Sequence, residues 1–239
     1  MEKIKKVFIG NKKNFYWKKG DLHTHLGIIK EDVAKNAEGK IKVKNNEFCA
    51  FNPNFLDQVK KISRGPQTLL PKDLAIILYY SGLEKNHVVV DAGAGCGLLA
   101  ITMARIAKKV TSYEINDKHA AIAKKNIDYF DMKNIELKNK SIYDGIDEKN
   151  VDLLTLDLPE PWNVLEHAEK SLKNGAYVVA YLPTITQVSK LVEEAKKYDF
   201  YFEKTIEVLE REWFVDGRKV RPKSDIIGHT AFITFLRKY

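Results

Sequence analysis

Residues 88–97 read Val-Val-Val-Asp-Ala-Gly-Ala-Gly-Cys-Gly, and this segment constrains the fold more than any other. The β-branched run favours a strand, the repeated glycine favours a loop, and the following LLAITMARIA is typical of a helix. Glycines at 93, 95 and 97 permit positive φ angles and let a ligand approach backbone N–H groups closely. We therefore predict a strand, a ligand-binding loop and a helix in immediate succession.

The spacing of these glycines excludes a dinucleotide fingerprint. G-x-G-x-x-G needs a third glycine where Leu98 stands, and Asp91 precedes the first glycine instead. The pattern D-x-G-x-G-x-G resembles motif I of the S-adenosylmethionine-dependent methyltransferases, which implies S-adenosylmethionine as the cofactor. An ordinary glycine-rich turn between a strand and a helix is the alternative interpretation.

An acidic residue follows at the end of the next predicted strand, residues 109–115. Glu114 lies 21 positions beyond Gly93. A carboxylate at about this distance, at the tip of the second strand, can accept hydrogen bonds from the ribose hydroxyls of a nucleoside. His119, near the start of the next helix, is a candidate neighbour of that ribose. A surface charge at Glu114 and an idle His119 remain the alternatives.

The chain divides into two parts by charge and pattern. Residues 1–62 hold 14 Lys against 7 Asp plus Glu, a net charge of +7, so residues 63–239 carry only +1 of the total +8. The first part shows short strand-like runs without a helical period, which predicts a small basic β-domain. Its lysines are either a solvated surface or a contact surface for nucleic acid.

From residue 67 onward, predicted helices and strands alternate. A helix is expected over 71–80, with strands near 88, 110, 136, 152 and 176 and helical stretches after 117, 163 and 184. Residues 200–215 and 228–236 then read as two strands without a helix between them. We predict an α/β fold with the seven-stranded Rossmann-like sheet of class I methyltransferases and a terminal β-hairpin, beside the small N-terminal β-domain.

The sequence argues against a membrane or secreted protein and against a disulfide framework or a metal site. No run of 18 apolar residues and no signal-peptide pattern occurs, so we expect a cytoplasmic protein without a membrane anchor. The two cysteines, Cys49 and Cys96, are too few for a disulfide framework or a metal site. We expect no metal ion.

A second constellation, Asp-Leu-Pro-Glu-Pro-Trp at 157–162, follows the predicted strand 151–156. Two prolines remove backbone donors and stiffen the loop, which leaves the Asp157 carboxylate free to face a planar ligand bearing an amino group. A proline-rich turn that simply ends the strand is the alternative.

Four motifs in order are similar to those of the tRNA adenine-N1 methyltransferases that modify adenine 58 in the T-loop. They are Pro71-Lys-Asp-Leu-Ala75, the glycine loop, DLPEPW, and Arg221-Pro222 followed by Gly228-His-Thr-Ala-Phe232, and the resemblance covers residues 63–239. It implies methyl transfer to N1 of adenine 58 in tRNA, with adenine 57 left open, by a homotetramer. A small-molecule methyltransferase of the corrinoid-pathway type and a non-catalytic RNA-binding protein are the competing interpretations.

The resemblance also implies residue roles. Asp157 is the catalytic candidate that meets the target adenine. The cofactor-binding candidates are Gln67, Asp91, Gly93, Ala94, Gly95, Cys96, Gly97, Leu98, Glu114, His119, Ser141, Ile142 and Asp157. Arg211, Arg218, Arg221 and His229 are the substrate-binding candidates on the RNA side. Two positions depart from the family pattern, since Ser141 stands where Asp is common and Leu70 stands where Tyr or His is common.

Overall fold

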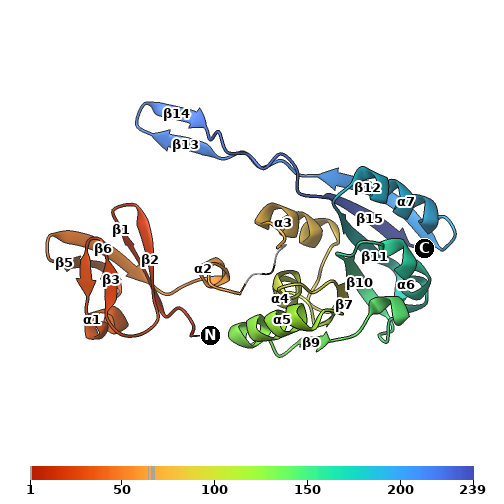
Figure 1. The fold of residues 1–239 in the computed structure, drawn as a ribbon, viewed down its shortest axis with the longest axis horizontal. Coiled ribbons are helices and arrows are strands. Elements are labelled where there is room, and N and C mark those ends of the chain that lie inside the picture. The colour runs from red at the N-terminus through yellow and green to blue at the C-terminus, as the bar shows by residue number, and fades with distance from the viewer. Residues whose placement is uncertain (1, 64, 66–67) are drawn as a thin grey trace. The chain divides into compact units, whose positions relative to one another are not determined.

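The computed structural model describes residues 2–63, 65 and 68–239 of the chain. The chain forms two compact units, Met1–Ser63 and Arg64–Tyr239. Figure 1 shows that the first unit is rich in strands, whereas the second combines helices with a large sheet. Each unit has a hydrophobic core of its own.

The first unit contains a four-stranded antiparallel sheet of order β2-β1-β6-β5 and a two-stranded ribbon, β3–β4. Its core packs around Phe8, Trp17 and Phe48. The elements are β1 (Lys6–Gly10), β2 (Lys13–Trp17), β3 (Leu22–Thr24), β4 (Gly27–Ile29), α1 (Glu31–Asn36), β5 (Gly39–Val43), β6 (Asn46–Phe51) and α2 (Phe55–Val59).

The two short helices of this unit correct the expectation that it holds no helix. α1 has six residues and α2 has five, which is too short for a helical period to show in the sequence. A capping box starts α2, because the Asn54 side chain accepts from the Asp57 N–H while the Asp57 carboxylate accepts from the Asn54 N–H.

The second unit is built on a seven-stranded sheet of order β12-β15-β11-β10-β7-β8-β9. The neighbours from β11 to β9 are parallel, and β15 is antiparallel to both β11 and β12. This sheet confirms the predicted fold class. Its strands are β7 (Val88–Ala92), β8 (Lys109–Tyr113), β9 (Ile135–Lys138), β10 (Val151–Leu156), β11 (Leu172–Leu182), β12 (Phe200–Glu207) and β15 (Phe232–Lys238).

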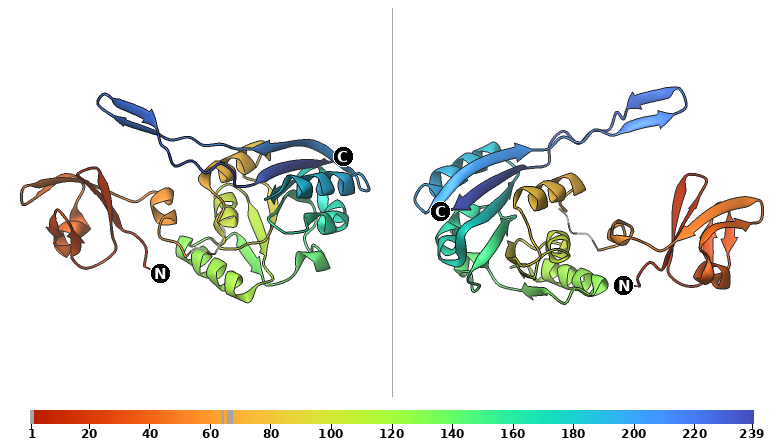
Figure 2. Two further views of the ribbon diagram at one scale, coloured as in Figure 1. Left: turned by 45° about the horizontal axis from the view of Figure 1, so that its top comes forward. Right: turned by 180° about the vertical axis from the view of Figure 1, so that it is seen from behind.

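Helices connect the parallel strands and pack on the sheet, as the views in Figure 2 show. α4 contacts β8 and α5 contacts β9, whereas α7 contacts β11, β12 and β15. The helices are α3 (Pro71–Tyr80), α4 (Leu98–Ala104), α5 (Asp117–Phe130), α6 (Leu165–Ser171) and α7 (Ile185–Ala195), with short 3-10 turns at η1 (Ile142–Asp144) and η2 (Pro161–Val164). Among the described residues, no helix is long and apolar enough to cross a membrane.

The strand order reverses at β7, because the chain adds β8 and β9 on one side of it and β10 and β11 on the other. Such a switch point opens a crevice at the carboxyl ends of the strands. Ala92, the last residue of β7, is in register with Tyr113 of β8 and Leu156 of β10. The residues that follow these three strands therefore lie side by side at the same edge of the sheet.

The terminal strands differ in extent from the two continuous runs that the sequence predicts. β12 and β15 pair only as far as Glu207 opposite Phe232, which is also where β11 ends at Leu182. Beyond that edge there is no sheet to pair with. Residues 213–222 instead form a separate ribbon of β13 (Trp213–Asp216) and β14 (Lys219–Pro222), which lies away from the main sheet in Figure 2.

Candidate active site

The glycine loop begins directly after β7. Gly93, Gly95 and Gly97 have φ angles of 87°, 55° and 80°, which only glycine adopts without strain. A Cβ added at Gly93 would stand 2.1 Å from the backbone oxygen of Asp157, so the loop after β7 lies directly against the loop after β10. A Cβ at Gly95 would have only one atom within 4 Å, the Gly93 oxygen at 3.8 Å.

Glu114 follows β8 and is buried against this loop. Its Oε2 accepts a hydrogen bond from the Gly95 N–H at 2.9 Å, and its Oε1 accepts one from the Asn116 N–H, also at 2.9 Å. Each oxygen keeps a second lone pair. The structure therefore brings Glu114 to the glycine loop, where the sequence places it.

Asp91 is buried inside the sheet and ties three strands together. Its two carboxylate oxygens accept hydrogen bonds from the Ser112 hydroxyl of β8 at 2.6 Å and from the Thr155 hydroxyl of β10 at 2.7 Å. Burial raises the pKa of Asp91, the two hydroxyls counteract the rise, and the nearby charge of Glu114 adds to it. Its direct contact with a cofactor stays a prediction, since both oxygens already have partners within the sheet.

Asp157 is the first residue after β10, and its N–H donates to the Ala92 oxygen at 2.9 Å. Burial raises the pKa of its carboxyl to about 7, and the charges of Asp91 and Glu114 contribute to the rise. Among the residues that the structure describes, none donates a hydrogen bond to this carboxylate. Asp157 is thus a half-buried acceptor that is free to take a donor from a ligand in either cavity that it lines.

Two cavities meet at Asp157. The first is bounded by the glycine loop, and the second has a volume of about 320 Å³. The first is lined by Thr68, Leu69, Gly93, Ala94, Gly95, Cys96, Leu98, Leu99 and Asp157. The second is lined by Thr68, Leu69, Leu70, Asp157, Tyr181, Pro183, Ile227 and Thr230. A molecule in one cavity therefore faces a molecule in the other across Asp157.

The lining of the first cavity does not include Ser141, Ile142 or His119. Ser141 caps η1, because its hydroxyl accepts from the Tyr143 N–H at 3.2 Å, and Ile142 is buried beside it. His119 lies in the first turn of α5. Gln67 falls outside the described residues. Within the described part of the chain, no group of three His, Cys, Asp or Glu is placed to hold a metal ion.

The candidates on the RNA side are not gathered at the cavities. Arg211, Arg218 and Arg221 are exposed on or beside the β13–β14 ribbon, and none of the three lines either cavity. The Arg221 guanidinium lies 5.9 Å from the ring centre of Phe214 on the neighbouring strand.

His229 makes two contacts within the protein. Its Nδ1 lies 2.6 Å from a Glu207 carboxylate oxygen and its Nε2 lies 2.8 Å from the Pro183 oxygen. Both partners are acceptors, so a protonated ring can donate to both of them. Glu207 and the Pro183 oxygen raise the pKa of His229 accordingly. The ring thereby fastens the segment before β15 to the end of β11.

Sequence reasoning missed Tyr181 and Thr230, which line the second cavity. Thr230 belongs to the quoted motif Gly228–Phe232, so its place in that motif was a usable signal. Tyr181 ends an apolar strand, and nothing local distinguishes it from a core residue.

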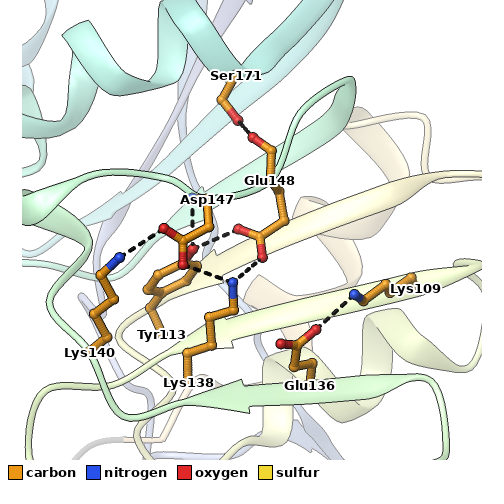
Figure 3. Close-up of polar contacts among 8 residues, drawn as sticks. All are labelled: Lys109, Tyr113, Glu136, Lys138, Lys140, Asp147, Glu148 and Ser171. Carbon is orange, nitrogen blue, oxygen red and sulfur yellow. Dashed lines mark hydrogen bonds and ion pairs between the residues drawn. The ribbon is translucent and has the colours of Figure 1, made fainter.

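A partly exposed charge cluster links β8 and β9 to Asp147 and Glu148 (Figure 3). Lys138 of β9 donates to Glu148 at 2.6 Å and to Asp147 at 3.0 Å, and Lys140 donates to Asp147 at 2.8 Å. The Tyr113 hydroxyl donates to Glu148 at 2.6 Å. Because Lys140 immediately precedes Ser141, the cluster fixes the start of η1 relative to β8 and β9.

We expect Glu148→Gln to lower the free energy of unfolding by about 2 kcal/mol at pH 7, since it weakens two charge-assisted hydrogen bonds. Burial raises the pKa of Glu148, but Lys138 and Tyr113 outweigh it and the pKa is lowered. The stabilisation is therefore present above the ordinary pKa of Glu and is lost as the pH falls through the lowered pKa. Urea denaturation of both proteins, at pH 7 and in acid, measures this difference.

Glu136→Gln is the matched control, because Glu136 pairs with Lys109 at 2.7 Å in the same view but is 47% exposed, against 10% for Glu148. Its effect should stay below about 1 kcal/mol. Equal losses for the two variants would contradict a structural role for the charge cluster.

Residues 61–223 match the family described as tRNA methyltransferase complex GCD14 subunit. The chain is 35% identical to the tRNA (adenine(57)-N(1)/adenine(58)-N(1))-methyltransferase TrmI of Methanocaldococcus jannaschii, over 90% of this chain and 86% of that protein. It is 32% identical to the tRNA (adenine(58)-N(1))-methyltransferase TrmI of Thermus thermophilus, over 92% and 89%. The chain belongs to the GCD14 tRNA methyltransferase family.

Solved structures agree with this family. The tRNA (m1A58) methyltransferase TrmI of Aquifex aeolicus superposes with a TM-score of 0.85 at 28% identity, covering 100% of this chain and 98% of that one. An S-adenosylmethionine-dependent O-methyltransferase of Thermotoga maritima gives 0.87 at 26% identity, covering 100% and 94%. A precorrin-6y methyltransferase covers 75% of this chain at 16% identity, which shows a shared fold alone. The family match confirms the resemblance predicted from the sequence, and the chain is a methyltransferase.

Proposed function

We propose that this methyltransferase transfers a methyl group from S-adenosylmethionine to N1 of adenine 58 in the T-loop of tRNA. The observation that carries the proposal is Asp157, a half-buried carboxylate that lines two adjoining cavities and accepts no hydrogen bond from the described residues. Such a carboxylate can accept from the N6 amino group of an adenine in the second cavity. One relative is named for both adenine 57 and adenine 58, so position 57 belongs to the same test.

The first cavity suits a nucleoside cofactor with an amino-acid tail. Gly95 leaves the backbone open, because an added Cβ there would meet only the Gly93 oxygen among the described residues, and the Glu114 oxygens each keep a lone pair for a ribose hydroxyl. We assign His119 to the ribose side and Ser141 with Ile142 to the adenine-ring side of this cavity. When bound, S-adenosylmethionine supplies an electrophilic methyl group on a sulfonium.

The protein has little covalent work to do. N1 of adenine carries an in-plane lone pair, so it would attack the methyl carbon without a base to remove a proton first, while the carbon–sulfur bond breaks and the sulfur leaves as a neutral thioether. Positive charge then develops on the adenine ring. Asp157, accepting from N6, holds the ring in line for attack and stabilises that charge.

N1 lies on the base-pairing edge of adenine, so the base has to leave its stack before it reaches Asp157. Opening the T-loop in this way requires that the protein bind the RNA backbone around the base. We assign this binding to the exposed arginines of the β13–β14 region, Arg211, Arg218 and Arg221, and to the basic N-terminal unit.

Strand β5 offers a specific test of the N-terminal unit. Lys40 and Lys42 alternate along this edge strand and are exposed, and exposed Lys44 follows it. If all three contact phosphates, replacing them with Ser reduces the slope of log Kd against log salt by about 2 to 3. Fluorescence anisotropy with tRNA at several salt concentrations measures the slope, and cofactor affinity should not change.

The control replaces Lys196 and Lys197 with Ser, because these exposed lysines pair with Glu193 and Glu194 at the end of α7. An unchanged slope in the β5 variant, or an equal change in the α7 variant, would show that the β5 lysines form only a solvated surface.

We further propose a homotetramer acting in the cytoplasm. Large apolar side chains are exposed on β12 and on the β13–β14 ribbon, including Tyr201, Trp213 and Val220, and exposed apolar surface of this kind is common at interfaces. Light scattering coupled to size exclusion measures the mass in solution. A mass of one chain, 27.4 kDa, at micromolar concentration would contradict the tetramer.

The methyl-transfer proposal is tested with unmodified tRNA transcripts and S-adenosylmethionine labelled in the methyl group. Nucleoside analysis of the digested product should show 1-methyladenosine, and replacing adenine 58 should remove the signal from that position. Incorporation into another nucleoside, or none above a protein-free reaction, would overturn the proposal.

A further inference from the structure

One of the two charged residues that begin α3 does not serve the helix. Lys72 and Asp73 lie in its first turn, and their side chains are 6% and 0% exposed. A lysine near a helix N-terminus opposes the helix dipole, and burying its charge costs further free energy. Helix formation therefore does not explain Lys72, and departures from local rules of this kind concentrate at functional sites.

The pair instead joins three segments that are distant in the sequence. Lys72 Nζ donates to Asp73 Oδ1 at 2.7 Å and to the Thr230 hydroxyl at 2.6 Å. The Tyr181 hydroxyl, at the end of β11, donates to Asp73 Oδ2 at 3.1 Å. The Thr230 hydroxyl in turn bonds to Tyr181. The ion pair thus closes a ring of hydrogen bonds and sets the direction of its donors.

This ring forms part of the wall of the second cavity, because Tyr181 and Thr230 line it together with Asp157. The phenol hydrogen of Tyr181 points to Asp73, so it is not available to Asp157. Burial raises the pKa of Tyr181, and the charges of Asp73 and Asp157 add to the rise, so the phenol stays neutral. Its oxygen keeps a lone pair for a ligand.

We propose that the Lys72–Asp73 ion pair makes Asp157 and Tyr181 act together as hydrogen-bond acceptors, so that the second cavity selects a base with an exocyclic amino group. This inference rests on the proposed function. The N6 amino group of adenine offers two hydrogens to these two acceptors. Lys72 and Asp73 are positioning residues, because they act through Tyr181 and Thr230 and do not line the cavity.

The test uses two tRNAs that differ only at position 58, which carries either adenosine or purine riboside. Purine riboside keeps the N1 lone pair and lacks the amino group. Single-turnover methylation at saturating cofactor and tRNA should favour adenosine by about 100-fold or more in the parent enzyme, because the purine leaves buried acceptors unpaired. In Asp73→Asn we expect this ratio to fall by about tenfold, since the Tyr181 hydrogen loses its charged acceptor and can turn to Asp157.

Asp152→Asn is the matched control. Asp152 accepts from Lys173 at 2.6 Å and from the Val88 N–H at 2.8 Å, at the opposite end of the strands, so its loss should leave the ratio unchanged. Equal losses with both tRNAs in Asp73→Asn would give the pair a merely structural role and overturn the inference, while the proposed function would stand. A parent enzyme that methylates neither tRNA would overturn both.

Cofactor affinity and the thermal transition report whether Asp73→Asn folds. If it does not fold, the double variant Lys72→Gln, Asp73→Asn removes both charges together and is measured in its place. A ratio equal to that of the parent in this variant would likewise overturn the inference.

Discussion

Asp157→Ala should lower the single-turnover rate of tRNA methylation by roughly 10²- to 10³-fold, since a preorganised charge contact to the transition state typically contributes that much. The substitution keeps β10 and the proline loop but removes the half-buried carboxylate that faces both cavities. Saturating cofactor and tRNA isolate the chemical step from binding and product release. Cofactor affinity, measured by calorimetry, should change little.

The pH dependence of the methylation rate tests the role of the Asp157 carboxylate in a second way. Only the ionised carboxylate accepts from N6, and the pKa of Asp157 is raised to about 7 by burial and by Asp91 and Glu114. The rate at low cofactor and tRNA concentration should therefore fall about tenfold per pH unit below that pKa. A bound sulfonium places a positive charge nearby, which lowers the pKa and moves the profile at saturation to lower pH.

Glu160→Gln is the control within the same loop. Glu160 is exposed, and its side chain contacts Asn163 rather than a cavity. Its rate should match the parent. A rate for Asp157→Ala within about threefold of the parent, far below the expected loss, would remove Asp157 as the adenine-facing group and make Glu160 the candidate.

The sequence predicts those parts of the site that are formed by residues adjacent in the chain. The strand, glycine loop and helix at 88–104 follow from local pattern, and parallel strands bring their following loops to one edge. That is why Glu114 and Asp157, which simply follow β8 and β10, lie where the sequence places them. The short helices α1 and α2 leave no period to read, so they were missed.

The wall of the second cavity could not be predicted in the same way. Tyr181 meets Asp73 across 108 positions of sequence, and Thr230 meets Lys72 across 158. No periodicity encodes such contacts, because they depend on how α3 packs against the ends of β11 and β15. The motif that contains Lys72 and Asp73 can be recognised in the sequence. Their contacts with Thr230 and Tyr181 cannot be predicted from it.

Gly93→Ala should destabilise the enzyme by about 2–4 kcal/mol, through backbone strain and overpacking. Its φ of 87° is unfavourable for alanine, and the new Cβ would meet the Asp157 backbone oxygen at 2.1 Å. Backbone cannot move aside as a flexible side chain can, so the loops after β7 and β10 must separate. Urea denaturation measures the loss, and calorimetry should show cofactor affinity reduced more than tenfold, since the cavity between these loops is deformed.

Gly95→Ala and Gly82→Ala separate crowding from strain. Gly82 has a φ of 59° and no atom within 4 Å of an added Cβ, so it reports strain alone, about 1 kcal/mol. Gly95 has a similar φ of 55° and an open Cβ direction but lines the first cavity. We expect Gly95→Ala to match Gly82→Ala in stability and to lose cofactor affinity, which Gly82→Ala keeps. A Gly93→Ala variant no less stable than these two would mean that the loops after β7 and β10 do not pack together in solution, and Asp157 would then lose the backbone contact that places it between the two cavities.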